Sequence, residues 1–332
     1  MTLEGKKVAI LGGGSWATAL AKIVLCNVEH INWYMRKQEQ IDGFVATGKN
    51  PDYLRAIRFD VSRINFTADI NEVVAESDIL IFAVPSPFIK AHLKKLRRSI
   101  KRKIIISAIK GMVPDENMVV TEYLHVRYEV PNEQLGMIAG PCHAEEVALE
   151  RLSYLTIGCT DKDNARCMSR LFETPFVNTT CSDDVWGLEY SSVMKNIYAI
   201  ASGICYGLNY GDNFQAVLTA NAIQEISRFV NATYPNHRDI NGSAYLGDLL
   251  VTTYSQFSRN RQFGNMLGRG YSVKAAQLEM EMVAEGYYGS KCIHDFNERF
   301  HVALPIADAV YNILYKKASP KIEIQELTKK LK

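Results

Sequence analysis

The first half of the chain alternates short apolar runs with longer amphipathic segments. The runs are rich in β-branched residues, and the segments between them carry apolar residues at three- and four-residue spacing. This alternation is typical of parallel strands joined by helical crossovers, so we predict a doubly wound α/β domain. The expected strands are Lys7–Leu11, Ile31–Met35, Ile79–Val84, Lys103–Ala108, Leu135–Ile138 and Ser153–Gly158. The expected helices are Ser15–Cys26, Lys37–Val45, Pro87–Ile100 and Asp115–Val126.

After about Ser182 the pattern becomes helical and convincing strands disappear. The expected helices there are Val185–Gly203, Asn213–Phe229, Ala244–Ser255, Arg259–Leu267, Val273–Met282 and Pro305–Tyr315, and Pro320–Lys332 reads as a charged tail or a terminal helix. The 332 residues exceed the usual size of one compact core. We therefore expect a Rossmann-like domain over 1–182 and an all-α domain over 183–332.

Charge and composition narrow the partners of the protein. Lys and Arg number 38 and Asp and Glu 36, so no global field attracts nucleic acid or an anionic membrane, and we expect neither partner. The basic run from Lys94 to Lys103 is interpreted as the solvated end of a helix rather than a nucleic-acid patch. Val185–Leu208 is weakly charged, but Glu189 and Lys195 interrupt it, so it reads as a buried helix and not as a membrane span.

The cysteines and the first residues favour a cytoplasmic protein. Seven cysteines are scattered with no Cys-x-x-Cys pair, which predicts reduced thiols and neither a disulfide framework nor a metal site. Residues 1–7 lead directly into an apolar run without the regions of a signal peptide. We expect a small-molecule substrate as the main partner, with a homodimer left open.

A glycine motif lies directly after the first expected strand. Gly12, Gly14 and Ala17 form Gly-x-Gly-x-x-Ala where a strand passes into a helix. Gly12 permits a tight turn, Gly14 lets the backbone approach a pyrophosphate, and Ala17 allows close packing of helix on strand. Free N–H groups at the helix N-terminus would bind the anion, so we predict a flavin or nicotinamide dinucleotide site.

The end of the second expected strand bears on the choice of dinucleotide. An acidic residue there would bind the adenosine ribose hydroxyl, but the chain has Arg36 and Lys37 instead. Two cations suit a 2′-phosphate, which favours NADP or use of both NADP and NAD.

Three charged residues stand in apolar surroundings. Lys195 lies in an otherwise almost uncharged helix, so its ammonium either reaches water or occupies a polar cleft with a lowered pKa, where it would transfer protons. Lys110 follows a strand, near the edge where such sheets bind ligands, or is an ordinary turn lysine. Asp248 is an acidic residue in an apolar segment, and it either orients a lysine ammonium or caps a helix.

Ser258, Arg259 and Asn260 precede or open an expected helix. Ser258 is a candidate N-cap, and Arg259 together with free helix amides would bind a phosphate. An ordinary capped helix is the alternative.

Together these fragments resemble one family, the bacterial-type NAD(P)-dependent glycerol-3-phosphate dehydrogenases. The resemblance runs from about Lys7 to Tyr315 and rests on ordered motifs, each weak alone. These are Gly12–Ala21, Ala83–Ser86, Lys110–Gly111, Gly140–Glu146, Val193–Asn196, Leu246–Leu249, Ser258–Gly264 and Glu285–Tyr287.

The resemblance implies reversible hydride transfer between NAD(P)H and dihydroxyacetone phosphate, which supplies glycerol 3-phosphate for phospholipid synthesis. It implies Lys195 as proton donor and acceptor, with Lys110 and Asp248 as its catalytic partners. The implied substrate contacts are Lys110, Gly140, Cys142, Lys195, Asp248, Ser258, Arg259 and Asn260. The implied cofactor contacts are Gly12, Gly14, Ser15, Trp16, Arg36, Lys110, Ala144, Arg259, Val283 and Glu285.

One motif departs from the family, and two other functions stay open. Family members usually read Gly-Pro-Ser/Thr-Phe-Ala where this chain has Cys142 and His143, so a weak thiol replaces a hydroxyl at a substrate contact. A β-hydroxyacid dehydrogenase would share the architecture, although the Ser258–Asn260 motif argues against it. A catalytically silent dinucleotide-binding regulator should have lost Lys110, Lys195 or Asp248, and all three are present.

Overall fold

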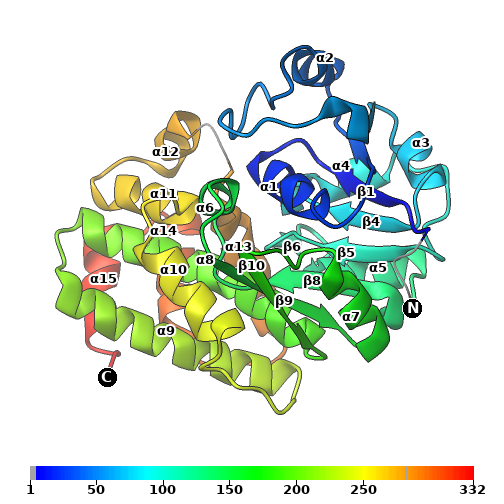
Figure 1. The fold of residues 1–332 in the computed structure, drawn as a ribbon. Coiled ribbons are helices and arrows are strands. Elements are labelled where there is room, and N and C mark those ends of the chain that lie inside the picture. Colours follow the sequence, from blue (N-terminus) through cyan, green and yellow to red (C-terminus); the bar gives the residue numbers. More distant parts are fainter. Residues whose placement is uncertain (1–4, 281–282) are drawn as a thin grey trace. The chain divides into compact units, whose positions relative to one another are not determined.

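The computed structural model describes residues 5–280 and 283–332, which form two compact units (Figure 1). Unit 1 comprises the chain up to Ile109 together with Val120–Val185, and unit 2 comprises Lys110–Val119 and Trp186–Lys332. The division after Val185 lies close to Ser182, after which the sequence pattern becomes helical. In addition, the short segment Lys110–Val119 leaves the first half of the sequence and packs with the second.

Unit 1 is built on one eight-stranded sheet in the order β10-β9-β8-β5-β4-β1-β2-β3. Its strands are β1 (Val8–Leu11), β2 (Ile31–Tyr34), β3 (Ile64–Thr67), β4 (Ile79–Phe82), β5 (Ile104–Ser107), β8 (Leu135–Ala139), β9 (Ser153–Cys159) and β10 (Val177–Ser182). Six neighbouring strands of this sheet are parallel, as predicted, namely β8, β5, β4, β1, β2 and β3. Of these, β1, β4 and β5 are buried along their whole length. This explains why their sequences are continuous apolar runs.

Two features of this sheet differ from the expectation. β9 pairs antiparallel with β8, and β10 follows β9, so these two strands reverse the sheet direction. The link from β8 to β9 holds only the five-residue α6 (Ala144–Ala148), so the chain turns back at the edge where β8 ends. β3 and β10 were not predicted, because Asn65, Asn178 and their polar neighbours mask the strand pattern.

The other helices of unit 1 are short. They are α1 (Ser15–Val24), α2 (Gln38–Thr47), α3 (Ile70–Ala75), α4 (Ile89–Leu93), α5 (Val120–Tyr128) and α7 (Lys162–Arg170), with 3₁₀ turns at Val61–Arg63, Ser86–Phe88 and Asn132–Gln134. The helix expected over Pro87–Ile100 is therefore only α4 and the turn before it. The helix expected over Asp115–Val126 begins later, because Asp115 and Asn117 adopt positive φ.

Unit 2 is helical apart from the hairpin of β6 (Met112–Val113) and β7 (Met118–Val119). Its helices are α8 (Val185–Gly207), α9 (Asp212–Thr233), α10 (Asp248–Tyr254), α11 (Arg259–Gly268), α12 (Val273–Glu279), α13 (Glu285–Asn297), α14 (Pro305–Tyr315) and α15 (Pro320–Thr328). A π-helical turn, Ser243–Gly247, precedes α10. The sequence did not predict α13, and the helix expected to reach Met282 ends at Glu279, with Glu281 and Met282 outside the described residues.

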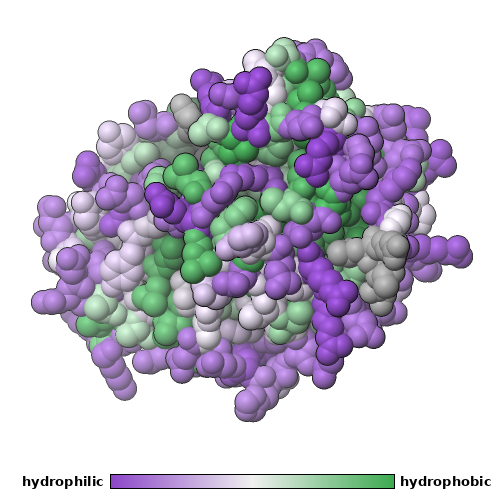
Figure 2. All heavy atoms as spheres, viewed as in Figure 1, coloured by the Kyte–Doolittle hydropathy of each residue, from purple (hydrophilic) through white to green (hydrophobic). Residues whose placement is uncertain are grey.

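Helix α8 is the core of unit 2. Almost all its residues from Leu188 to Cys205 are buried, so it is apolar around its circumference as a central helix must be. None of the described helices is long and apolar enough to cross a membrane. Figure 2 shows polar and charged residues over most of the face in view.

Glycines allow α8 and α11 to touch backbone to backbone. A Cβ atom added at Gly203 would lie 2.0 Å from the Arg261 carbonyl oxygen, and one at Gly264 would lie 2.1 Å from that of Ile200. Gly207 and Gly268 continue the contact one turn later, so the two helices run in the same direction along it. The N-terminus of α11 is therefore held beside the turn of α8 that contains Asn196.

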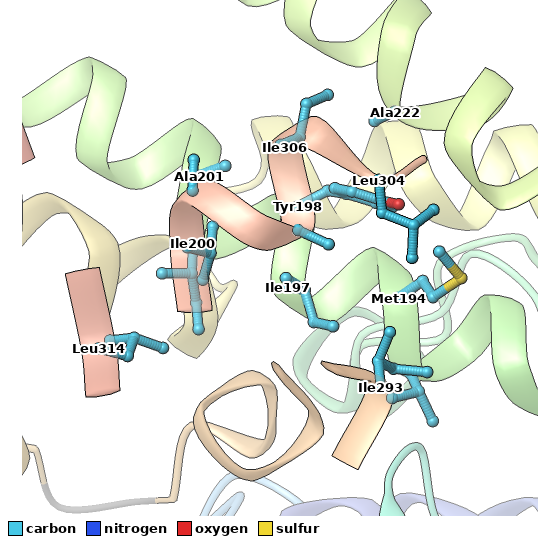
Figure 3. Packing of buried hydrophobic residues seen from close by; sticks show 14 of the residues in the cluster. Met194, Ile197, Tyr198, Ile200, Ala201, Ala222, Ile293, Leu304, Ile306 and Leu314 are labelled. Carbon is cyan, nitrogen blue, oxygen red and sulfur yellow. The ribbon is translucent and has the colours of Figure 1, made fainter. Parts of the chain in front are cut away.

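A buried carboxylate joins three helices of this core. Glu225 of α9 is 0% exposed and accepts hydrogen bonds from the backbone N–H groups of Ile306 and Ala307, at the start of α14, and from the Tyr198 hydroxyl of α8 at 3.1 Å. Figure 3 shows Tyr198 of α8 beside Leu304 and Ile306. Burial raises the pKa of Glu225 to about 7, although these bonds and nearby Arg228 lower it.

This pKa predicts that the contribution of Glu225 to the free energy of unfolding decreases as the pH rises from about 4.5 to 7. In that range the folded protein retains a proton on Glu225 that the unfolded chain has lost, so ionisation favours unfolding. Glu225→Gln should remove this contribution, which is at most about 3 kcal/mol. The difference in the free energy of unfolding between the variant and the parent protein should therefore favour the variant more at pH 8 than at pH 5. Urea unfolding at both pH values checks it, with exposed Glu326→Gln as control. An unchanged pH dependence in Glu225→Gln would contradict the assignment.

Candidate functional site

The glycine loop of unit 1 lies at the carboxyl edge of the sheet, after β1. Gly12 has φ +137°, and a Cβ atom there would lie 2.4 Å from the Ala83 carbonyl oxygen, so only glycine fits. Trp33 of β2 donates its indole N–H to the Gly12 carbonyl oxygen at 2.7 Å. Gly14 is different, because open space surrounds its Cβ position. This gap is where a phosphate would approach the backbone.

Buried side chains hold the carbonyl groups of this loop. The Gly13 carbonyl oxygen accepts hydrogen bonds from Gln40 at 2.8 Å and from Asn50 at 3.1 Å, and the Gly14 carbonyl oxygen accepts one from Thr18 at 2.9 Å. These acceptors are turned into the protein, and the N-cap residue of α1, Gly14, provides no side-chain cap for the helix. Its first N–H groups are thus suited to an anion. The residues present fit a dinucleotide pyrophosphate.

The other predicted cofactor positions of unit 1 lie at the same edge. Ser15 and Trp16 open α1, and Arg36 is exposed two residues after β2. Gly140 follows β8 with φ +113°, and Ala144 begins α6. The edge is shared because β1, β2 and β8 point the same way.

Cys142, the departure from the family pattern, lies in the turn after Gly140. Its thiol donates to the Tyr154 carbonyl oxygen at 3.2 Å, and its backbone N–H donates to the Gly140 carbonyl oxygen at 2.9 Å. The thiol therefore has a partner on neighbouring β9.

Unit 2 contains a buried carboxylate between two ammonium groups. Lys195 of α8 donates to Asp248 Oδ1, and Lys110 Nζ lies 3.4 Å from Asp248 Oδ2. The side chains of Lys195 and Asp248 are 6% and 2% exposed, and that of Lys110 is 13% exposed. The structure thus brings together the three residues that the family resemblance implies as a catalytic set. The sequence left open whether the Lys195 ammonium reaches water or is held among polar groups with a lowered pKa. The burial of Lys195 agrees with the second interpretation.

The surroundings of Lys195 favour loss of its proton near neutral pH. Burial lowers its pKa from 10.5 to about 8, the Asp248 carboxylate opposes this shift, and the Lys110 charge adds to it. Both protonation states of Lys195 are therefore accessible close to pH 8, as a group that both donates and accepts protons requires.

Two polar residues that the sequence did not assign to the site bond to the backbone of this set. Asn196 donates to the Lys110 carbonyl oxygen at 2.8 Å, which ties the segment before β6 to α8. Thr252 donates to the Asp248 carbonyl oxygen at 2.6 Å. The sequence did carry a signal for them, because Asn196 is adjacent to Lys195 and Thr252 lies one helical turn after Asp248.

The predicted phosphate site is the N-terminus of α11. Ser258 caps the helix by accepting from the Arg261 N–H at 3.3 Å, and Asn260 accepts from the Gly286 N–H at 2.9 Å. A Cβ atom at Gly286 would lie 2.6 Å from the Asn196 carbonyl oxygen, so this junction lies against α8. Among the described residues, none makes a hydrogen bond or ion pair with the half-buried Arg259 side chain. Its guanidinium is available for an anion.

The last two predicted cofactor residues precede or begin α13. Val283 is half-buried, and Glu285 is the first residue of the helix, next to Gly286. Unit 1 therefore carries one group of predicted residues at the edge of its sheet, and unit 2 carries the other where α8, α10, α11 and α13 meet.

Comparison with known proteins gives a consistent result. Residues 7–165 match the family model described as NAD-dependent glycerol-3-phosphate dehydrogenase N-terminus, and residues 184–325 match the corresponding C-terminus model. A glycerol-3-phosphate dehydrogenase [NAD(P)+] of Clostridium botulinum is 33% identical over 97% of this chain and 96% of its own. One of Bacillus velezensis is 33% identical over 98% and 95%. The crystal structure of glycerol-3-phosphate dehydrogenase from Coxiella burnetii has a TM-score of 0.89 at 27% identity, covering 97% of this chain and 98% of the other.

The two loop glycines should respond differently to substitution by alanine. Gly12→Ala forces a Cβ atom against a backbone oxygen at positive φ, so we expect a clear loss of thermal stability. Gly14→Ala meets open space and should leave the melting temperature nearly unchanged, yet weaken dinucleotide binding at least tenfold, because its methyl group occupies the phosphate approach. Thermal unfolding and NADH titration measure the two effects. Unaltered NADH affinity in Gly14→Ala would remove this loop from the cofactor site.

Proposed function

The chain belongs to the NAD-dependent glycerol-3-phosphate dehydrogenase family, and from this premise we propose that it interconverts glycerol 3-phosphate and dihydroxyacetone phosphate. The cofactor is NAD or NADP, and when bound it supplies or accepts the hydride. The single observation that carries the proposal is the buried Lys195–Asp248–Lys110 group in unit 2. The glycerol 3-phosphate that this reaction forms would supply phospholipid synthesis.

Lys195 is the proton donor and acceptor in this proposal. In the reductive direction the protonated Lys195 gives a proton to the oxygen that develops negative charge at the former carbonyl. In the oxidative direction the neutral amine removes the hydroxyl proton. Its lowered pKa supports both roles, because neither protonation state is far from neutral pH.

Lys110 and Asp248 adjust this chemistry. The Lys110 ammonium stabilises the developing oxyanion, and its charge helps keep the pKa of Lys195 low. Asp248 holds both ammonium groups in place and offsets part of their charge in a site that is largely buried.

The substrate phosphate is assigned to Ser258, Arg259 and Asn260. The support is the Arg259 guanidinium, which no described residue bonds, beside the N-terminus of α11, where helix amides favour an anion. We keep Gly140 and Cys142 as further substrate contacts. The proposed cofactor contacts are Gly12, Gly14, Ser15, Trp16, Arg36, Lys110, Ala144, Arg259, Val283 and Glu285.

We further propose a dinucleotide-binding domain over 1–182 and a substrate domain over 183–332, in a cytoplasmic protein. All seven cysteines are free thiols, as expected in a reducing compartment. A homodimer is also proposed. Its support is the exposure of two tyrosines, Tyr206 on α8 and Tyr254 on α10, helices that a hydrogen bond from Ser202 to the Thr253 carbonyl oxygen joins.

The pKa of Lys195 predicts the pH dependence of turnover. For dihydroxyacetone phosphate reduction, kcat/KM should decrease as the pH rises through about 8, because the proton donor is lost. Asp248→Asn should move this decrease to lower pH, since the carboxylate raises the pKa of Lys195. Lys195→Ala should abolish turnover yet bind NADH normally. Near-normal kcat in Lys195→Ala would exclude it as the proton donor.

Arg36 tests the cofactor preference. If its guanidinium contacts the adenosine 2′-phosphate, Arg36→Ala should weaken the binding of NADPH about tenfold or more, which is the value of one charge-assisted pair. The binding of NADH should scarcely change. Isothermal titration with both cofactors checks this. Arg102→Ala is a matched control, since Arg102 is also exposed but precedes β5, at the opposite edge of the sheet. Equal losses for NADPH and NADH in Arg36→Ala would refute the phosphate contact.

A further inference from the structure

Ser192 carries a buried hydroxyl that the catalytic group of Lys195, Asp248 and Lys110 does not use. The residue is 1% exposed, and Ser192 Oγ has no hydrogen-bond partner within 5–280 and 283–332. Leaving a buried hydroxyl unpaired destabilises the folded protein, because the group has lost its hydrogen bonds to water and gained none in return. Such a group requires an explanation, and a bound ligand is one.

Its place on α8 points to the substrate. Ser192 lies three residues before Lys195 and four before Asn196, so the three side chains share one face of the helix. A long helical side chain lies over the turn that precedes it, which brings the stem of Lys195 towards Ser192. Lys195 donates to Asp248, and the side-chain N–H of Asn196 donates to the Lys110 carbonyl oxygen, so Ser192 is the one of the three whose side chain makes no hydrogen bond to a described residue.

The substrate of the proposed function, on which this inference rests, has three polar parts. Its carbonyl oxygen is assigned to Lys195 and its phosphate to the N-terminus of α11. The primary hydroxyl remains, and it is both a donor and an acceptor, as is a serine hydroxyl. We propose that Ser192 Oγ binds the primary hydroxyl of dihydroxyacetone phosphate, and so selects it over analogues that lack this group.

The test compares dihydroxyacetone phosphate with hydroxyacetone phosphate, which lacks the primary hydroxyl. The parent protein should prefer dihydroxyacetone phosphate in kcat/KM. Ser192→Ala should lower kcat/KM for dihydroxyacetone phosphate about tenfold, the effect of about 1.4 kcal/mol, and leave hydroxyacetone phosphate nearly unchanged. Its melting temperature should stay the same or rise, because no hydrogen bond of the folded protein is lost.

Ser202→Ala is the matched control on the same helix. Ser202 is also 1% exposed, but its hydroxyl lies 2.8 Å from both Gln215 Oε1 and the Thr253 carbonyl oxygen. This variant should lose stability and keep the substrate preference, which is the reverse of Ser192→Ala. Should Ser192→Ala fold poorly, Ser192→Gly also removes the hydroxyl and serves the same comparison.

Three outcomes would overturn the inference: an unchanged preference in Ser192→Ala, equal losses for both substrates, or a change confined to NADPH affinity. The parent protein separates this inference from the function on which it rests. A parent without dihydroxyacetone phosphate activity would refute the proposed function, whereas an active parent with any of these outcomes would refute the role of Ser192 alone.

Discussion

The carboxylate of Asp248, held between two lysines in an almost dry site, is the interaction on which the chemistry of unit 2 depends. Two ammonium groups could not be buried so close together without it, because their repulsion and desolvation would drive one of them to lose its proton. With a single carboxylate between two cations the group keeps an excess of positive charge. That excess would suit the proposed binding of a phosphorylated substrate and the proposed stabilisation of a developing oxyanion.

Close backbone contacts give this group its geometry. The proposed proton donor Lys195 is on α8, the carboxylate of Asp248 is on α10 and the amides proposed to bind phosphate are on α11, so the proposed site depends on how these helices pack. Gly203 and Gly264 remove the side chains that would keep α8 and α11 apart, and Gly286 does the same for α13. Polar side chains then complete the alignment, as when Asn196 fixes the segment of Lys110.

Unit 1 applies a related principle to anion binding. Trp33, Gln40, Asn50 and Thr18 occupy the carbonyl oxygens of the glycine loop, which leaves amide groups as the loop's exposed polarity. A loop with free carbonyl groups would repel a pyrophosphate, so these donors matter as much as the glycines. They are dispersed over some thirty residues in sequence, and only the folded sheet brings them together.

The sequence by itself determined the features that arise from local pattern and composition. The apolar runs of β1, β4 and β5 identify buried parallel strands, the glycine loop identifies a dinucleotide turn, and an isolated lysine in an apolar helix marks Lys195 as unusual. Tertiary structure decided the rest, because it depends on contacts between distant segments. The reversal of β9 and β10, the move of Lys110–Val119 into unit 2 and the donors to the loop carbonyls have no local signature. Above all, only folding brings Asp248 to Lys195, since a buried charge is explained by its partner and the partner lies far away in sequence.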